Sequence, residues 1–258
     1  MNDIPKIVFR KMTLEENIEI IKWAYYEDNG LLSVHDYTVQ YFPELANLDK
    51  KLSKDKIFRT IEKVVKKDYL ENEKMIEQEV KRYNDVWEKY NNIYFTNLSN
   101  YFNIEWKYDS TIIDASVGLI PIFPRYLDTN SFSIGTNVSD EKLISVSAHE
   151  TLHFWWFMKW KELYPKIPSK EYDSPYLSWQ YSEMVTDPIL NNEPFHKIFD
   201  FLEERGYDSF YEMVDGDKLV MDKLRDIYKQ DIRTDEKIKL GFEYLKKIKR
   251  NNEKDKKM

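Results

Sequence analysis

The sequence contains no cysteine, which excludes disulfides, thiolate metal ligands and cysteine nucleophiles together. Its six glycines form neither a GxGxxG nor a GxxxxGKS/T pattern, and this disfavours a phosphate-binding loop. No apolar run approaches the ~20 residues that span a bilayer, and the opening residues lack the apolar stretch of a signal peptide. We therefore expect a soluble, cytoplasmic protein without a membrane partner.

Acidic residues outnumber basic ones, and the formal net charge is -7. Because general nucleic-acid binding requires a basic surface, we expect no nucleic-acid partner. Hydrophobic residues make up 42% of the chain and aromatic residues 16%, which is typical of a packed globular protein rather than a disordered one. A chain of 258 residues can bury a substantial core, as one large domain or two modest ones.

Hydrophobic periodicity predicts helices over much of the chain. Thr13 and Glu16 form a capping-box pattern after a short predicted strand, so a helix should begin there. Within residues 54–99, apolar side chains recur in alternating steps of four and three, which places them on one helix face. This face should pack against the protein's own core, although a coiled-coil dimer is an alternative.

The character of the sequence changes near residue 101. Residues 101–135 are rich in β-branched and aromatic residues and predict a small sheet. From residue 138 onward the pattern is helical again. We therefore predict a mostly helical α+β protein, with a helical N-terminal region over residues 1–100 and a second domain over residues 101–258.

The stretch VSAHETLHFWWF, residues 146–157, holds two of the four histidines. Positions i and i+4 of a helix point the same way, so His149 and His153 can present ring nitrogens to one zinc ion. Glu150 can lean over the open side of that ion and take a proton from bound water. This is the HExxH arrangement of zinc hydrolases. The alternative is a buried aromatic helix whose histidines bond to carbonyl groups, which leaves the charge of Glu150 unexplained.

A catalytic zinc site takes three protein ligands and a water, so a third ligand is needed. Lys159 stands where a metzincin would carry its third histidine, and Glu162 lies about 13 Å of helical rise beyond His153. Glu183 lies on a separate predicted helix, from which it can approach across a cleft. With Asp187 four residues later, the stretch EMVTD resembles the ExxxD of the gluzincins, the thermolysin-like clan of zinc metallopeptidases.

The resemblance implies a zincin-like core, with a small mixed sheet packed on the active-site helix, and a metalloprotease that hydrolyses peptide or protein substrates. It implies that Zn²⁺ is held by His149, His153 and Glu183. Glu150 would then be the general base, and Asp187 would hydrogen-bond the outer nitrogen of a ligand histidine. Because a residue before proline is disfavoured in a helix, Asp187 could instead cap a new helix that begins at the next residue.

The resemblance extends to two further features. Asn130–Gly135 (NSFSIG) is similar to the edge strand on which these peptidases bind substrate backbone. Gluzincins also often carry a Tyr or His that stabilises the oxyanion, and three residues compete for this role: His196, Tyr207 and Tyr211. The alternative function is a catalytically silent, zincin-fold binding or regulatory protein, although such a protein has no use for the charge of Glu150.

Overall fold

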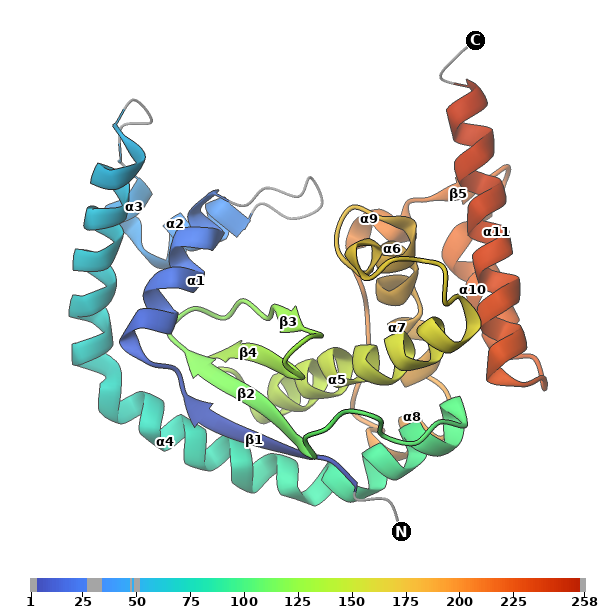
Figure 1. The fold of residues 1–258 in the computed structure, drawn as a ribbon, viewed down its shortest axis with the longest axis horizontal. Helices are drawn as coiled ribbons and strands as arrows, with labels where there is room; N and C mark the ends of the chain where they lie inside the picture. Colours follow the sequence, from blue (N-terminus) through green and yellow to red (C-terminus); the bar gives the residue numbers. More distant parts are fainter. Residues whose placement is uncertain (1–3, 27–33, 47, 49–51, 256–258) are drawn as a thin grey trace. The chain divides into compact units, whose positions relative to one another are not determined.

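A computed structural model describes most of the chain (Figure 1). The described residues are 4–26, 34–46, 48 and 52–255. They form two compact units. We call these the sheet unit, which holds the described residues of 5–91 and 110–146, and the helical unit, which holds mainly residues 92–109 and 147–255.

Both units draw residues from either side of residue 100, where the sequence predicted a boundary. The long helix α4 (Lys54–Phe102) gives its last turns to the helical unit, and α5 (Asp140–Leu163) gives its first turns to the sheet unit. The predicted α+β class, mostly helical with a small mixed sheet, is confirmed. Among the described residues, no helix combines the length and the apolar character needed to cross a bilayer.

The sheet unit is built around four strands in the order β1-β2-β4-β3. Their bounds are β1 (Lys6–Lys11), β2 (Ile112–Gly118), β3 (Arg125–Tyr126) and β4 (Ser131–Gly135). β1, β2 and β4 run parallel, and β3 pairs antiparallel with β4. Between β1 and α4, the described residues form the helices α1 (Leu14–Tyr26), α2 (Val34–Tyr41) and α3 (Pro43–Ala46). Phe9, Val117 and Phe132 on the strands are almost fully buried, so the sheet carries the core of this unit.

The capping box predicted at the start of α1 is confirmed. The backbone N–H of Glu16 donates to Thr13 Oγ1 at 3.1 Å, and the backbone N–H of Thr13 donates to Glu16 Oε2 at 2.7 Å. Two backbone donors that the helix start leaves unpaired are thus satisfied reciprocally. The short strand predicted before this box is β1.

The outer edge of β1 is covered by asparagine side chains of α4. Asn84 accepts from the backbone N–H of Phe9 at 3.1 Å and donates to its carbonyl at 2.9 Å. Asn91 accepts from the backbone N–H of Ile7 at 3.2 Å and donates to the carbonyl of Pro5 at 3.0 Å. These amides therefore replace a further strand and satisfy backbone groups that a bare sheet edge would expose.

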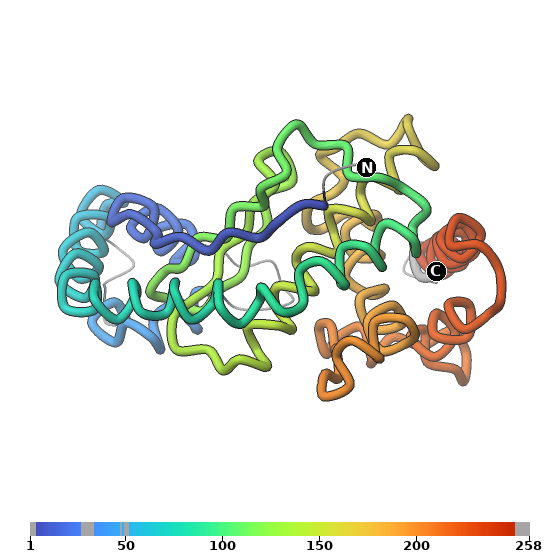
Figure 2. Tube along the Cα trace, turned by 90° about the horizontal axis from the view of Figure 1, so that it is seen from below, coloured from blue at the N-terminus to red at the C-terminus, as the bar shows by residue number. Residues whose placement is uncertain are grey.

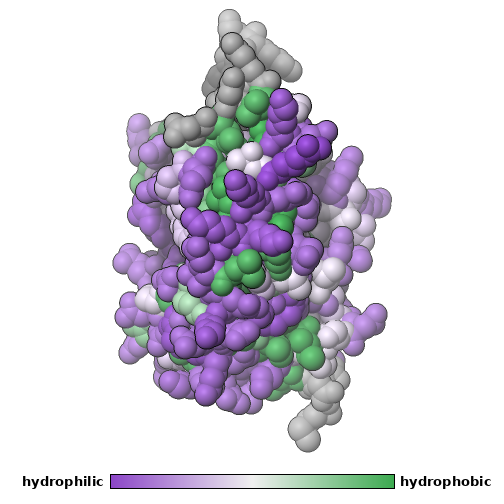
Figure 3. All heavy atoms as spheres, turned by 90° about the vertical axis from the view of Figure 1, so that its left-hand side faces the viewer, coloured by the Kyte–Doolittle hydropathy of each residue, from purple (hydrophilic) through white to green (hydrophobic). Residues whose placement is uncertain are grey.

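The apolar face predicted for α4 is buried within the chain. Ile76, Tyr83, Trp87 and Tyr94 are each at most 1% exposed. The side of the molecule that carries the first half of α4 shows mainly hydrophilic side chains, with separate hydrophobic areas between them (Figure 3). The helix therefore packs on the protein's own core, as predicted, and a coiled-coil dimer is not needed to cover this face.

The stretch NSFSIG forms β4, but β4 is not an edge of the sheet. It pairs with β2 along its whole length, from Ser131 to Gly135, and with β3 at Ser131 and Phe132. The partner on the second side, β3, has only two residues and carries no strand pattern of its own. The predicted edge strand is therefore wrong.

Gly135, at the end of β4, allows the backbone of Pro121 to approach closely. A Cβ at this position would overlap Pro121 Cα and lie 2.5 Å from Pro121 N. Because both are backbone atoms, the chain at Pro121 would have to move. We expect Gly135→Ala to lower the free energy of unfolding by about 1–3 kcal/mol, the usual cost of overpacking. Urea unfolding followed by circular dichroism measures this loss, and an unchanged midpoint would contradict the close approach.

The helical unit contains the end of α4, most of α5 and a series of short helices. The helices are α6 (Leu177–Met184), α7 (Thr186–Leu190), α8 (Phe195–Ile198), α9 (Asp208–Tyr211), α10 (Val220–Tyr228) and α11 (Thr234–Asp255). A 3₁₀ helix (Ser169–Tyr172) precedes α6, and a hairpin of β5 (Val214–Asp215) and β6 (Lys218–Leu219) precedes α10. α10 and α11, orange-red and red, lie side by side (Figures 1 and 2).

Aromatic side chains of α5 form part of the core of the helical unit. Trp155 stacks on Phe95 with 5.0 Å between ring centroids. Trp156 and Trp160 both pack against Tyr181 of α6, at 5.0 and 6.0 Å. None of the three tryptophans is measurably exposed. Trp155 therefore packs α5 on α4, and Trp156 and Trp160 pack α5 on α6.

Candidate metal centre

α5 brings the two histidines of the HExxH stretch together. His149 and His153 lie one turn apart on the helix, and their Nε2 atoms are 3.1 Å from each other. The side chain of His149 is 17% exposed and that of His153 is fully buried. Both imidazoles therefore bring Nε2 to one place in a largely buried site.

Glu183 of α6 reaches the same point. Its Oε2 lies 3.3 Å from His149 Nε2, and its Oε1 lies 3.5 Å from His153 Nε2. The ligand atoms of His149, His153 and Glu183 all lie within 4.8 Å of one another. Ligand atoms bound to one tetrahedral zinc at 2.0–2.2 Å would be roughly 3.3–3.6 Å apart. The three side chains that the sequence predicted as ligands are thus grouped closely enough to bind one metal ion.

Glu183 is placed by the tertiary contacts of its own helix. Tyr181, two residues earlier, approaches the Tyr228 hydroxyl at 3.0 Å and donates to the carbonyl of Ile238 at 3.1 Å. A Cβ at Gly241 would overlap the Tyr181 hydroxyl and lie 2.7 Å from its ring carbon Cζ. Glycine at this position therefore lets α6 dock on α11, and that docking turns the buried Glu183 toward α5.

The acidic surroundings of His149 favour its charged form. Burial alone would lower the pKa of His149, but the charge of Glu204, the hydrogen bonds to Glu183 and Glu204, and the charge of Glu150 hold this pKa well above its usual value. A cation that binds Nε2 of His149 must displace the proton from that nitrogen. The same carboxylates would then stabilise the cation. The partners of His149 are carboxylates and His153 rather than backbone carbonyls.

Glu150 lies next to His149 on α5 and is 8% exposed. A carboxylate is rarely buried without a reason, because removal from water disfavours its charge. Its charge acts on His149, the preceding residue and a candidate ligand.

Glu204 is a functional candidate that the sequence did not reveal. Its Oε1 lies 2.7 Å from His149 Nδ1, and its side chain is 5% exposed. It belongs to the irregular segment between α8 and α9, in the run FLEERGY, where an acidic pair offers no motif or periodicity. The structure buries Leu202 and Glu204 and exposes Glu203 between them, but two consecutive glutamates do not reveal in the sequence which of them is buried.

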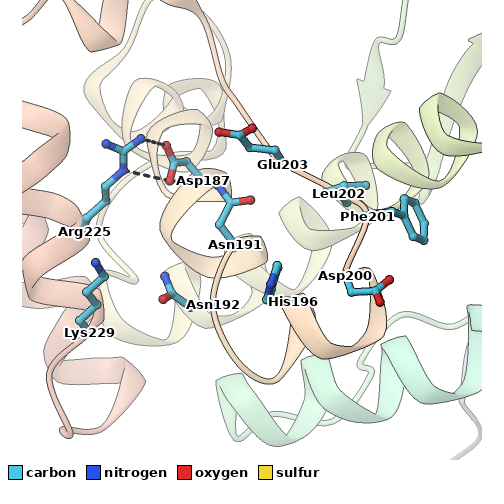
Figure 4. Close-up of a pocket in the computed structure, with 10 residues that line it drawn as sticks. All are labelled: Asp187, Asn191, Asn192, His196, Asp200, Phe201, Leu202, Glu203, Arg225 and Lys229. Carbon is cyan, nitrogen blue, oxygen red and sulfur yellow. Dashed lines mark hydrogen bonds and ion pairs between the residues drawn. The ribbon is translucent and has the colours of Figure 1, made fainter.

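Asp187 does not contact either histidine. Its carboxylate accepts from Arg225 Nη2 at 2.7 Å and from Arg225 Nε at 3.2 Å (Figure 4). It also accepts from the Tyr211 hydroxyl at 2.8 Å and from Asn191 Nδ2 at 3.3 Å. The predicted hydrogen bond to a ligand histidine is therefore not made. Arg225 comes from α10, and its guanidinium matches a carboxylate better than an imidazole does.

The second predicted role of Asp187, as a helix cap, is also not observed. α6 ends at Met184 and α7 begins at Thr186, so the expected break before Pro188 is present. Val185 is the N-cap of α7, and no side chain caps it. Asp187 instead lies inside the first turn and forms the ion pair with Arg225.

Asp187→Asn should affect stability more than metal binding. The substitution keeps the shape of the side chain but removes the charge that pairs with Arg225, whose side chain is 37% exposed. We expect the free energy of unfolding to fall by about 1–3 kcal/mol, because hydrogen bonds to a buried charge are lost. Zinc affinity should remain near that of the wild type. A fall in zinc affinity without loss of stability would show that Asp187 acts on the metal site after all.

A pocket of about 480 Å³ lies beside Asp187 (Figure 4). Its lining residues come from α7, α8, α10 and the segment before Glu204, and include His196, Arg225 and Lys229 but none of the three candidate ligands. His196 is thus placed in this pocket. The hydroxyl of Tyr211 donates to Asp187.

The third candidate for stabilising an oxyanion, Tyr207, packs its ring against Trp179 at 5.8 Å and Phe210 at 5.6 Å. Of the residues predicted for the site, the structure therefore brings together His149, Glu150, His153 and Glu183, and adds Glu204. No protein-family model, no curated protein and no solved structure matches this chain. The chemistry of the site is accordingly inferred from its own side chains.

Proposed function

We propose that the protein is a zinc-dependent metallopeptidase of the gluzincin type, with a zincin-like core in which α5 and α6 carry the metal ligands. The observation that supports this most is the grouping of His149 Nε2 and His153 Nε2, 3.1 Å apart, with the Glu183 carboxylate, whose Oε2 lies 3.3 Å from His149 Nε2 and whose Oε1 lies 3.5 Å from His153 Nε2. Two imidazoles and one carboxylate are a ligand set of catalytic zinc sites, which keep a fourth position for water.

The chemistry proposed is hydrolysis of a peptide bond. Zn²⁺ held by His149, His153 and Glu183 would supply a Lewis acid that polarises the scissile carbonyl and lowers the pKa of a water molecule. Glu150 would accept a proton from the attacking water molecule as the water oxygen adds to the carbonyl carbon. Glu150 then hands the proton to the amine nitrogen as the carbon–nitrogen bond breaks, so the base is regenerated.

A peptide mixture tests this function directly. Purified protein loaded with zinc is incubated with peptides from a digested proteome, and mass spectrometry identifies the new termini. We expect cleavage that stops when a chelator removes the metal and returns when zinc is added back. If the zinc-loaded protein cleaves no peptide, the catalytically silent binding protein becomes the better account.

A further inference from the structure

We infer that Glu204 is the positioning residue that fixes His149 in its metal-binding orientation, and that Asn191 holds Glu204 in place. This inference rests on the proposed function, since it needs a metal ion at Nε2 of His149. It assigns to Glu204 the part that the ExxxD resemblance implied for Asp187.

The two ring nitrogens of His149 face different partners. Nδ1 lies 2.7 Å from Glu204 Oε1, whereas Nε2 faces His153 Nε2 at 3.1 Å and Glu183 Oε2 at 3.3 Å. A neutral imidazole has one N–H donor and one acceptor nitrogen. When Nδ1–H donates to the Glu204 carboxylate, the lone pair remains on Nε2, which is the atom grouped with His153 and Glu183. Glu204 thereby selects the tautomer and makes Nε2 a stronger donor to a metal.

Glu204 is held from outside the site by Asn191, the residue at the C-cap of α7. Asn191 Oδ1 accepts from the backbone N–H of Glu204 at 2.7 Å, and Asn191 Nδ2 donates to the backbone carbonyl of Glu204 at 2.8 Å. One amide side chain thus binds both backbone polar groups of a residue in an irregular segment. This clamp is needed because no helix or strand fixes residues 202–207.

Burial and charge distinguish Glu204 from the other acidic residue of this region. Glu204 and Asp187 have nearly the same side-chain exposure, 5% and 4%. Asp187 is neutralised by Arg225, whereas Glu204 pairs with the imidazole of His149. Asp187→Asn is therefore the control: it removes the charge of an equally buried carboxylate in the same unit that does not touch a ligand, and it keeps an Oδ1 that can accept from Asn191 Nδ2, as Asp187 does.

The experiment measures zinc affinity by chelator competition in the full-length protein. The variants are Glu204→Gln, Glu204→Ala, Asn191→Ala and the control Asp187→Asn, each also melted in the metal-free form. We expect Glu204→Gln to weaken zinc binding ~10-fold and Glu204→Ala up to ~100-fold, the usual range for a partner of a ligand histidine. Glutamine rescues part of the loss because its amide oxygen still accepts from Nδ1–H. The zinc affinity of Asn191→Ala should lie between those of the wild type and Glu204→Ala.

A merely structural role would give a different result. In that case zinc affinity would follow the metal-free melting temperature, and Asp187→Asn would lose as much affinity as Glu204→Gln; this outcome overturns the inference. Zinc binding in both Glu204 variants equal to the wild type overturns it as well, while the proposed function stands. If the wild type itself binds no zinc, the proposed function fails, and the role of Glu204 fails with it.

Discussion

Glu150→Gln is expected to abolish peptide hydrolysis while zinc binding remains. Glutamine keeps the size of the side chain on the buried turn of α5, but its amide cannot accept the proton of the attacking water. Removal of a general base costs at least ~10²-fold in rate, and we expect kcat/KM to fall by that factor or more. Assays with a peptide found to be cleaved by the wild type, together with zinc content, measure both parts of this prediction.

Glu141→Gln is the matched control for this variant. Glu141 lies in the first turn of the same helix and is exposed, so its amide should leave activity unchanged. If Glu150→Gln cleaves the peptide at a rate near that of the wild type, Glu150 is not the base, and the proposed mechanism fails at its proton-transfer step.

Glu183→Ala is expected to have the second large effect, on metal affinity. The substitution leaves two imidazoles of one helix, and these occupy only part of a zinc coordination sphere. The loss of affinity should exceed the ~10–100-fold that removal of a ligand's hydrogen-bond partner costs, and therefore also exceed the loss in Glu204→Ala. Chelator competition measures it.

The control for Glu183→Ala is Asp187→Asn, four residues away, whose carboxylate is equally inaccessible but is bound by Arg225. Zinc affinity in Glu183→Ala equal to that of this control would place the third ligand on another residue. The proposal that α5 and α6 together supply the three ligands would then be wrong, even if both histidines bind the metal.

The parts of this molecule that local rules determine could be predicted from the sequence. The spacing of His149 and His153 fixes their common direction, because one helical turn separates them. The capping box at Thr13 and Glu16 depends on residues three apart and needs no tertiary contact. The mostly helical chain with a small mixed sheet follows from hydrophobic periodicity in the same way.

The parts that depend on contacts between distant segments could not be predicted. Asp187 has the spacing of a gluzincin aspartate. In the structure, however, it forms an ion pair with Arg225 of α10. Glu204 reaches His149 from an irregular segment whose course is set by Asn191, and no spacing rule links these three residues. The second neighbour of β4 is likewise a two-residue strand that only the folded sheet defines.

We expect His149, His153 and Glu183 to bind one metal ion. Anomalous diffraction at the zinc absorption edge, recorded from crystals of the zinc-loaded protein, would locate that ion. We predict one strong anomalous peak per chain, about 2.0–2.2 Å from Nε2 of both histidines and from a Glu183 carboxylate oxygen. A fully zinc-loaded protein whose anomalous peak lies away from these three side chains would contradict the account.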